Sequence, residues 1–304
     1  MSRPRKIALG LLAAAVLLVV AATVALLMYP RELITWYTRS GLERAGLEQQ
    51  FVDHDHGRLS YFIGGEGPPL VFIHGLSDQA GSWHTIASQF DEHTVIAVDL
   101  PGHGDSPYSN GELLSEASIM PLFVLLDQLI DDEQAVIVGN SLGGWIAMEY
   151  ALYHPEAIKR LVPVGSAGME HDIDPTLLMP ENRDDARRTI QTIFGDNPPP
   201  VPGFVLDHMV ERAERSVVAD VFDRHHEARY LDDDLPDLDV PTELIWGTED
   251  LIFPLDYAER LHDKLARSRL HIIDGCGHSP QVGCPDEFAE LLHEVLTDSA
   301  PPAQ

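Results

Sequence analysis

The chain has 304 residues, of which 44% are hydrophobic, and its 49 acidic and 20 basic side chains give a formal net charge of -29 at pH 7. A chain with this much negative charge is not expected to bind nucleic acid or anionic substrates. The length beyond the N-terminal segment suits one ordinary α/β domain with enough apolar residues for a core. Our hypothesis for the charge is a halophilic protein, because high salt screens the repulsion within an acidic surface of dense, hydrated carboxylates.

The N-terminus contains a long apolar segment. Residues 7–28 are 22 residues without a charge, and at a rise of about 1.5 Å per residue a helix of that length crosses a hydrocarbon core of about 30 Å. Arg3, Arg5 and Lys6 precede this predicted transmembrane helix and only Arg31 follows closely, so the N-terminus is expected in the cytoplasm and the remaining chain outside it, in the periplasm or extracellular space. The alternative is a signal peptide that is cleaved to give a secreted protein, although the apolar core of such peptides is usually only about 7 to 15 residues.

Residues 31–50 mix apolar and aromatic side chains, such as Trp36, Tyr37 and Leu42, with three arginines. This composition is typical of an amphipathic helix at a membrane interface. A linker helix packed on the domain gives the same pattern. Both interpretations stay open, and both hold the domain near the bilayer.

Short apolar runs then alternate with helical stretches, which predicts a mostly parallel sheet covered by helices on both faces. The predicted strands form a hairpin at residues 51–55 and 59–63 and continue with residues 70–73, 94–98, 135–138, 161–164, 243–246 and 270–273. The segment between the sixth and seventh of these strands, residues 167–235, is long and contains three consecutive prolines and apolar helical clusters.

The most informative motif is Gly-Asn-Ser-Leu-Gly at residues 139–143, between an apolar run and a helix-like stretch. A strand, a tight glycine-flanked turn and a helix form a nucleophile elbow, which exposes one strained serine at the carboxyl end of a sheet. Ser141 is therefore the candidate nucleophile. The alternative is an ordinary glycine-rich turn, which the flanking strand and helix disfavour.

A serine nucleophile needs a histidine base and an acid that orients the histidine, in the order serine, acid, histidine on such a sheet. Asp250 follows the predicted strand 243–246 and is the candidate acid, although it and Glu249 could be solvated residues of a very acidic protein. His278 lies in a glycine-rich loop after the predicted strand 270–273 and is the candidate base, with a surface histidine as the alternative.

Acyl transfer also requires backbone donors for an oxyanion, usually the amide after the nucleophile and one from the loop after an earlier strand. Leu142 supplies the first, and Leu76, after the predicted strand 70–73, is expected to supply the second. His74 at the end of that strand is expected to brace the loop rather than to take part in chemistry.

The two cysteines, Cys276 and Cys284, lie on either side of His278. A disulfide could brace the histidine loop of an exported domain, but we expect buried free thiols because spacing alone does not establish the geometry. Neither the cysteines nor the paired histidines match a zinc pattern, so no metal and no cofactor are predicted.

Five blocks in register make the chain resemble the α/β-hydrolase family from about residue 50 to 297. These blocks are His74-Gly75, residues 99–106 (Asp-Leu-Pro-Gly-His-Gly-Asp-Ser), residues 139–144, Gly247-x-x-Asp250 and residues 275–278. The block at 99–106 resembles a structural turn of the family, so His103 and Asp105 are assigned no chemistry. A serine at position 141 argues against the branches of the family that use an aspartate nucleophile.

The resemblance implies an α/β-hydrolase fold, and residues 167–235 resemble the family's helical cap. The expected domains are a membrane anchor at 1–30, a juxtamembrane helix at 31–50, a core at 51–166 and 236–299, and the cap at 167–235. The anchor followed by this domain looks like the membrane-anchored monoacylglycerol lipase branch, which implies a serine hydrolase of lipid esters. The alternatives are a short-chain carboxylesterase, a hydrolase of C-C bonds with the same triad, and a non-catalytic fold that binds a small ligand.

Overall fold

The computed structural model describes residues 30–54, 57–107, 116–130, 133–213, 218–219, 221 and 229–301. The strands are β1 Glu48–His54, β2 Gly57–Gly64, β3 Pro69–Ile73, β4 Thr94–Val98, β5 Ala135–Asn140, β6 Ile158–Val164, β7 Thr242–Gly247 and β8 Ser268–Ile273. The α-helices are α2 Pro30–Arg44, α3 Glu116–Ile130, α4 Leu142–Tyr153, α5 Arg183–Phe194, α6 Gly203–Ala213, α8 Leu255–Lys264, α9 Pro280–Gly283 and α10 Pro285–Thr297. Short 3-10 turns lie at η1 Ala80–Thr85, η2 Ala87–Gln89, η3 Pro155–Ala157, η4 Pro175–Leu177 and η6 Leu235–Asp237.

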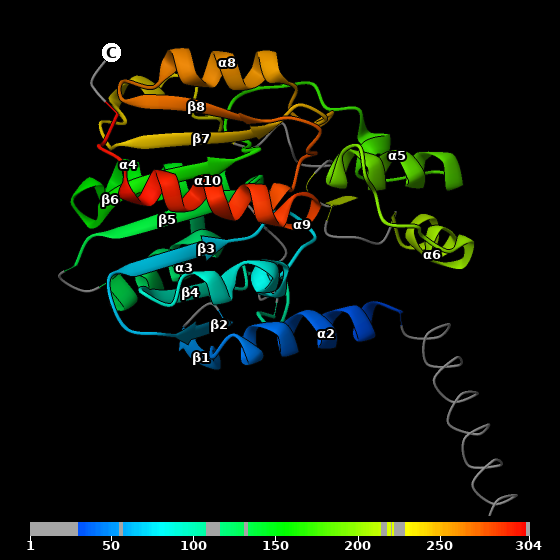
Figure 1. Cartoon of the computed structure of the whole chain (residues 1–304), viewed down its shortest axis with the longest axis horizontal. Coiled ribbons are helices and arrows are strands. Elements are labelled where there is room, and N and C mark those ends of the chain that lie inside the picture. Colours follow the sequence, from blue (N-terminus) through cyan, green and yellow to red (C-terminus); the bar gives the residue numbers. More distant parts are fainter. Residues whose placement is uncertain are drawn as a thin grey trace, which may run out of the picture.

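Within the described residues the strands form one 8-stranded sheet in the order β1-β2-β4-β3-β5-β6-β7-β8 (Figure 1). The pairs β1/β2 and β2/β4 are antiparallel, and all other neighbours are parallel. The prediction of a mostly parallel sheet that begins with a hairpin is therefore confirmed. Several strands extend beyond the predicted bounds, and β5 continues to Asn140, directly before the candidate nucleophile.

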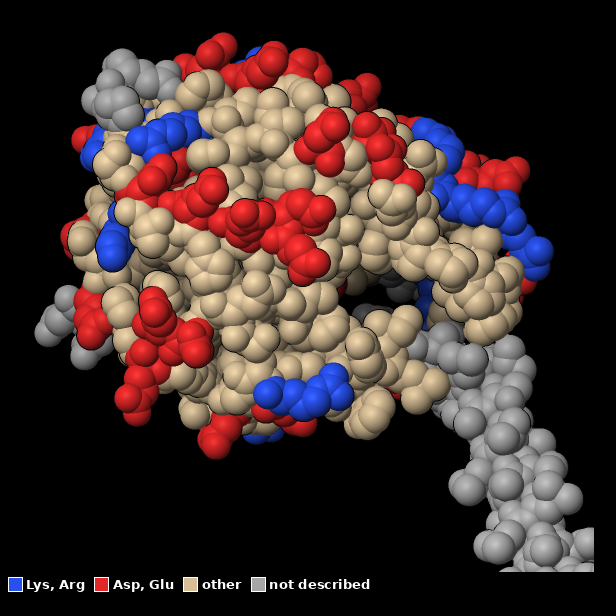
Figure 2. All heavy atoms as spheres, viewed as in Figure 1, with Lys and Arg blue, Asp and Glu red and all other residues tan. Residues whose placement is uncertain are grey.

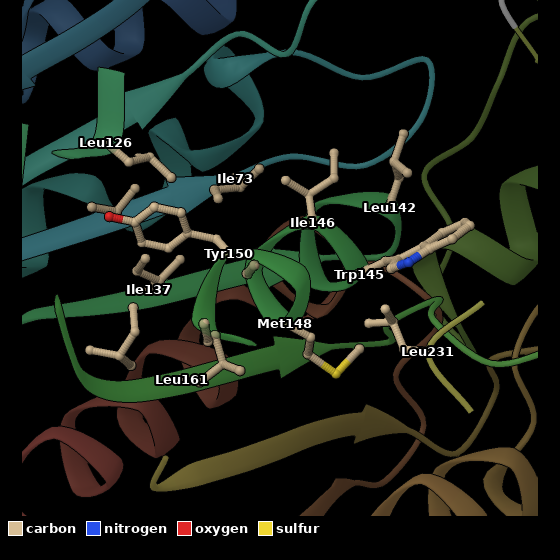
Figure 3. Packing of buried hydrophobic residues seen from close by; sticks show 14 of the residues in the cluster. Ile73, Leu126, Ile137, Leu142, Trp145, Ile146, Met148, Tyr150, Leu161 and Leu231 are labelled. Atoms are coloured by element: carbon tan, nitrogen blue, oxygen red, sulfur yellow. The ribbon is translucent and has the colours of Figure 1, made fainter. Parts of the chain in front are cut away.

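Side chains of each buried strand alternate between two cores, one on each face of the sheet. On β3, Val71 and Ile73 join the core formed with α3, α4 and α8, whereas Leu70 and Phe72 join the core formed with α2, η1 and α10. Figure 3 shows the first core, in which Tyr150 and Ile146 of α4 pack over the strands. Helices thus cover both faces, as predicted, because the strands are apolar on both sides.

Between β6 and β7 the chain leaves the sheet and forms α5 and α6, which lie beyond one end of the sheet (Figure 1). Helix α5 begins where the Asn182 side chain accepts hydrogen bonds from the N–H groups of Asp184 and Asp185. An ion pair between Arg183 and Asp207 joins α5 to α6. These helices lie in the segment that was predicted to be a cap.

Helix α2 packs on the domain. Leu42 is fully buried in the core that α2, η1 and α10 form on one face of the sheet. Gly41 lies so close to His84 that a Cβ on Gly41 would be 2.6 Å from the His84 ring. Arg39 forms an ion pair with Asp105. The part of the chain that the structure describes contains no helix long and apolar enough to cross a membrane. The predicted span at residues 7–28 lies outside the described residues.

Substituting Leu42→Ala is expected to lower the free energy of unfolding by about 2–5 kcal/mol, because the change leaves a cavity between α2 and the sheet. The exposed neighbour provides a control, since Glu43→Ala should change the free energy by no more than about 0.5 kcal/mol. Urea unfolding of both variants measures the difference. Equal stability of the two variants would mean that α2 does not belong to the folded domain.

Candidate active site

Ser141 occupies a sharp turn between β5 and α4, with φ 55 and ψ -118. Positive φ strains a residue that has a side chain, and the surroundings must hold it in place. The Ser141 N–H donates to Val164 O at 2.9 Å. A Cβ at residue 139 would lie 2.4 Å from Gly143 O, and one at residue 143 would lie 2.3 Å from Ile73 O, so both flanking positions require glycine. The geometry is that of a nucleophile elbow.

Asp250 and His278 meet in the structure. His278 Nδ1 lies 2.8 Å from Asp250 Oδ2, and both side chains are buried. Asp250 Oδ1 accepts two further hydrogen bonds, from the N–H groups of Ile252 at 2.9 Å and Phe253 at 3.0 Å. Because an aspartate carboxylate only accepts, the proton of this contact belongs on Nδ1, which leaves Nε2 of His278 free to accept a proton.

The candidate residues follow neighbouring parallel strands at the carboxyl edge of the sheet. Ser141 follows β5, Asp250 follows β7 and His278 follows β8. Strand β6 lies between β5 and β7 and is followed by Gly165. A Cβ on Gly165 would lie 3.1 Å from Asp250 Oδ2 and 3.2 Å from His278 Nδ1. The absence of a side chain at Gly165, which has φ +47, leaves room for the acid and the histidine to meet.

The loop after β3 contacts the elbow. A Cβ on Gly75 would lie 3.1 Å from Ser141 Cβ, so Leu76 directly follows a point of contact with the candidate nucleophile. Leu142 is the first residue of α4, where a backbone N–H has no acceptor within the helix. The two backbone donors predicted for an oxyanion are thus on segments that flank Ser141.

Two histidines brace this loop, and neither contributes to the acid and base pair. His74 Nδ1 donates to Gly75 O at 2.7 Å, and its Nε2 accepts from the N–H of Leu100 at 3.0 Å. His103 Nε2 accepts from the N–H of Ser77 at 3.0 Å. Burial lowers the pKa of His74 well below its ordinary value, and the neighbouring His103 lowers it further. The His74 ring therefore stays neutral, and its Nε2 can accept a hydrogen bond. His74 therefore has the bracing position expected of it.

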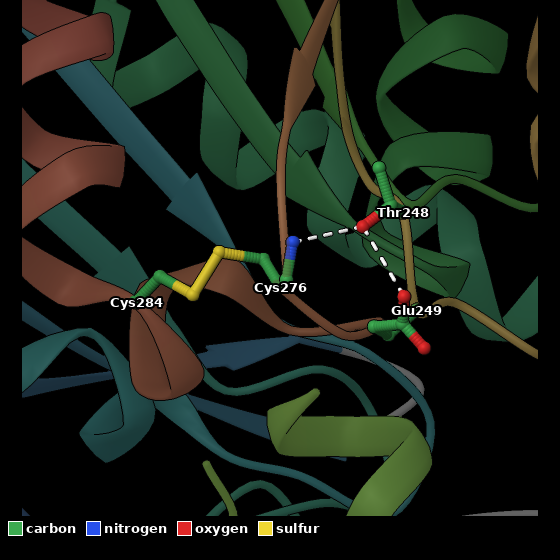
Figure 4. The surroundings of a disulfide bond; sticks show 5 residues. Thr248, Glu249, Cys276 and Cys284 are labelled. Atoms are coloured by element: carbon green, nitrogen blue, oxygen red, sulfur yellow. Dashed lines mark hydrogen bonds between the residues drawn. A yellow bond between two sulfur atoms is a disulfide. The ribbon is translucent and has the colours of Figure 1, made fainter. Parts of the chain in front are cut away.

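Residues 275–279, the histidine loop, are fixed to their surroundings at several points. Cys276 and Cys284 form a disulfide with a Cα–Cα distance of 6.0 Å, so the expectation of free thiols was wrong (Figure 4). The expectation failed because residues eight apart come together only when α9 turns the chain back. The Gly275 N–H also donates to Thr248 Oγ1 at 2.8 Å, which ties the histidine loop to the loop that carries Asp250.

Helix α5 also contacts the histidine loop, and no local pattern in the sequence indicates this contact. The His278 N–H donates to Thr192 O at 2.7 Å, and the Ser279 N–H donates to Ile193 O at 3.1 Å. The last carbonyl groups of a helix receive no hydrogen bond from an N–H group of the same helix. The N–H groups of the histidine loop therefore supply donors for carbonyl groups at the end of α5. The sequence pattern also did not indicate a role for Asn140. This residue is a buried polar side chain at the end of an otherwise apolar strand.

The mostly parallel sheet and the sharp turn between β5 and α4 have the arrangement of an α/β-hydrolase. The model of the alpha/beta hydrolase family matches residues 70–291, and the chain belongs to this family. The described residues include no group of three or more His, Cys, Asp or Glu side chains that could hold a metal ion.

The chain is similar to several characterised hydrolases. The human monoacylglycerol lipase ABHD6 is 25% identical, and the match covers 95% of this chain and 93% of that protein. A 2-hydroxy-6-oxo-6-(2'-aminophenyl)hexa-2,4-dienoic acid hydrolase of Metapseudomonas resinovorans is also 25% identical, with 83% of this chain and 92% of the relative covered. The crystal structure of a membrane phospholipase A described as a bacterial virulence factor superposes with a TM-score of 0.74 at 27% identity, covering 94% of this chain and 97% of the other.

Substituting Asp78→Asn in the loop after β3 is expected to stabilise the protein at neutral pH by about 3 kcal/mol and to have little effect near pH 4. Burial raises the pKa of the Asp78 carboxyl from 3.8 to about 6, with a smaller contribution from the Asp99 charge. The folded state therefore binds this proton more tightly than the unfolded state, and stability is lost as pH rises from about 4 through 6.

Asparagine has no proton to lose, so the variant should lack this loss. Urea unfolding of the wild type and the variant at several pH values between about 4 and 8 measures the effect. A constant difference between the two proteins at all these pH values would contradict the assignment.

Proposed function

We propose that the protein is a membrane-tethered serine hydrolase that cleaves carboxylic esters through Ser141, His278 and Asp250. The observation that carries the proposal is the 2.8 Å contact between His278 Nδ1 and the buried Asp250 carboxylate, beside the strained turn at Ser141. A serine hydroxyl is a poor nucleophile until a base takes its proton, and a base is effective only when its tautomer is fixed.

In the proposed reaction Ser141 Oγ attacks the ester carbonyl while Nε2 of His278 accepts the hydroxyl proton. The N–H groups of Leu76 and Leu142 bind the oxyanion of the tetrahedral intermediate. The C–O bond to the alcohol then breaks, and His278 returns the proton to the leaving oxygen. A water molecule, activated by the same histidine, hydrolyses the acyl-enzyme and releases the acid. Asp250 orients the imidazole and stabilises its positive charge throughout.

A lipid ester such as a monoacylglycerol is the substrate class that we propose. Its support is the similarity over nearly the whole chain to a monoacylglycerol lipase and to a membrane phospholipase A. We assign residues 167–235, which include α5 and α6, to a cap above the site, in which an acyl chain would lie. The alternatives are a short-chain carboxylesterase and a C-C bond hydrolase, the latter favoured by the relative from Metapseudomonas. A non-catalytic ligand-binding fold is the alternative from a different class.

A series of nitrophenyl esters separates these alternatives. We expect hydrolysis with a preference for medium or long acyl chains, and a loss of about a thousandfold or more in kcat for Ser141→Ala, because the proposed acyl-enzyme forms on the Ser141 hydroxyl. Preference for acetate or butyrate would favour the short-chain esterase. No hydrolysis by the wild-type protein would bring forward the C-C hydrolase and the ligand-binding fold.

The membrane tether in our proposal is the apolar segment at residues 7–28, with α2 next to it at the bilayer surface. Although α2 packs on the domain, Ile34, Trp36 and Tyr37 remain more than half exposed, at 56%, 66% and 55%. Aromatic side chains of this kind favour the interface between lipid and water. The helix can therefore contact both the domain and the headgroups.

Cell fractionation tests the tether. We expect the full-length chain in the membrane fraction after an alkaline wash and its release by detergent, because a span of 22 apolar residues inserts far more stably than a surface contact. Mass spectrometry of the intact protein should find residues 1–30 attached. A soluble mature protein that begins beyond residue 22 would contradict the tether and support signal cleavage.

The halophilic hypothesis belongs to the same proposal. Figure 2 shows acidic side chains spread over the face in view, with basic side chains at only a few places, which agrees with the net charge of -29. Salt shortens the range of charge repulsion from about 10 Å at 0.1 M to about 3 Å at 1 M. We expect the unfolding temperature and the esterase activity to fall on dilution from molar to low salt. Equal stability across this range would exclude the hypothesis.

A further inference from the structure

The side chain of Asn140, the residue before the candidate nucleophile, is 2% exposed and makes four hydrogen bonds. Its Nδ2 donates to Val164 O and to His278 O, both at 2.9 Å. Its Oδ1 accepts from Ser279 Oγ at 3.2 Å and from Gln281 Nε2 at 3.1 Å. Three of these four partners belong to the segment that carries the candidate base.

The hydrogen-bonding capacity of this amide is fully used. A primary amide has two N–H donors and an oxygen that accepts two bonds. The donors of Asn140 face two carbonyl oxygens and its oxygen faces two donors, which fixes the orientation of the amide. A buried polar group that is fully satisfied in this way specifies one local arrangement, and loss of its partners is unfavourable.

The sheet alone does not fix the distance between Ser141 and His278. Among the described strands, β5 pairs with β3 and β6, whereas β8 pairs only with β7, so two strands separate the elbow from the strand that leads to the base. The Asn140 side chain spans this gap, since it extends from the last residue of β5 to the His278 carbonyl. It joins the nucleophile and the base more directly than the path through the sheet.

We propose that Asn140 is a positioning residue that holds His278 within reach of the Ser141 hydroxyl. This inference rests on the proposed function. Asp250 holds the imidazole ring, and the Thr192 carbonyl of α5 holds the backbone N–H of His278. Asn140 holds the backbone carbonyl of the same residue, so His278 is fixed at its ring and at both sides of its backbone.

Two substitutions in the full-length protein test the role. Asn140→Ala removes all four hydrogen bonds, and Asn140→Asp keeps the size but removes both donors and places a carboxylate against two carbonyl oxygens. A displacement of about 1 Å in an active site reduces turnover by on the order of 100-fold. We therefore expect both variants to lose about 100-fold in kcat for a nitrophenyl ester and in the rate at which a fluorophosphonate modifies Ser141, with KM within about twofold of the wild type.

Thr242→Val is the matched control. Thr242 is fully buried at the start of β7, far along the strand from the site, and its hydroxyl donates to Val240 O at 3.0 Å. This variant should unfold at a lower temperature yet keep its kcat and labelling rate. If the Asn140 variants do not fold, Ser279→Ala removes only one bond to Asn140 and should reduce the labelling rate severalfold at unchanged KM.

Folded Asn140 variants that lose stability like Thr242→Val but keep the wild-type kcat and labelling rate would overturn the positioning role and leave the proposed function intact. A wild-type protein that neither hydrolyses the ester nor reacts with the fluorophosphonate at Ser141 would instead overturn the proposed function, and the positioning role with it.

Discussion

The left-handed backbone conformation of Ser141 is the constraint on which the rest of the structure around the site depends. A residue with a side chain adopts positive φ only where its surroundings require it. Here β5 and α4 meet so tightly that residues 139 and 143 must be glycine, and the Ser141 N–H is held by the end of β6. The strained turn fixes the serine at the carboxyl edge of the sheet, and the other groups of the site have to be brought to it.

The base and the acid come from strands on one side of this turn, and long-range contacts hold them. Asp250 orients His278, a disulfide and Thr248 restrain the histidine loop, and α5 accepts its backbone N–H groups. The segment between β6 and β7 is therefore in direct contact with the candidate base. A movement of α5 away from the core would break these hydrogen bonds.

The sequence predicted what local patterns encode. Apolar runs and glycine-rich turns predicted the strands and placed Ser141, Asp250 and His278 after three of them, because these residues follow their strands within a few positions. The roles of these residues and the cap bounds remain predictions. The disulfide was not foreseen because the geometry of the α9 turn cannot be inferred from spacing. Asn140 and Thr192 were missed because their partners lie far away in the sequence. Helix α2 was ambiguous because a membrane and a protein core select the same apolar face.

Trapping of the acyl-enzyme tests the central claim most directly. Wild-type protein mixed rapidly with a medium-chain nitrophenyl ester should release a burst of close to one nitrophenol per active site when deacylation is slower than acylation, and acid quenching should preserve the acyl group. Mass spectrometry is expected to find that group on the peptide containing Ser141, and to find none after His278→Ala under the same conditions. An acyl group on another residue, or turnover of the ester with no covalent adduct under conditions of slow deacylation, would contradict the account.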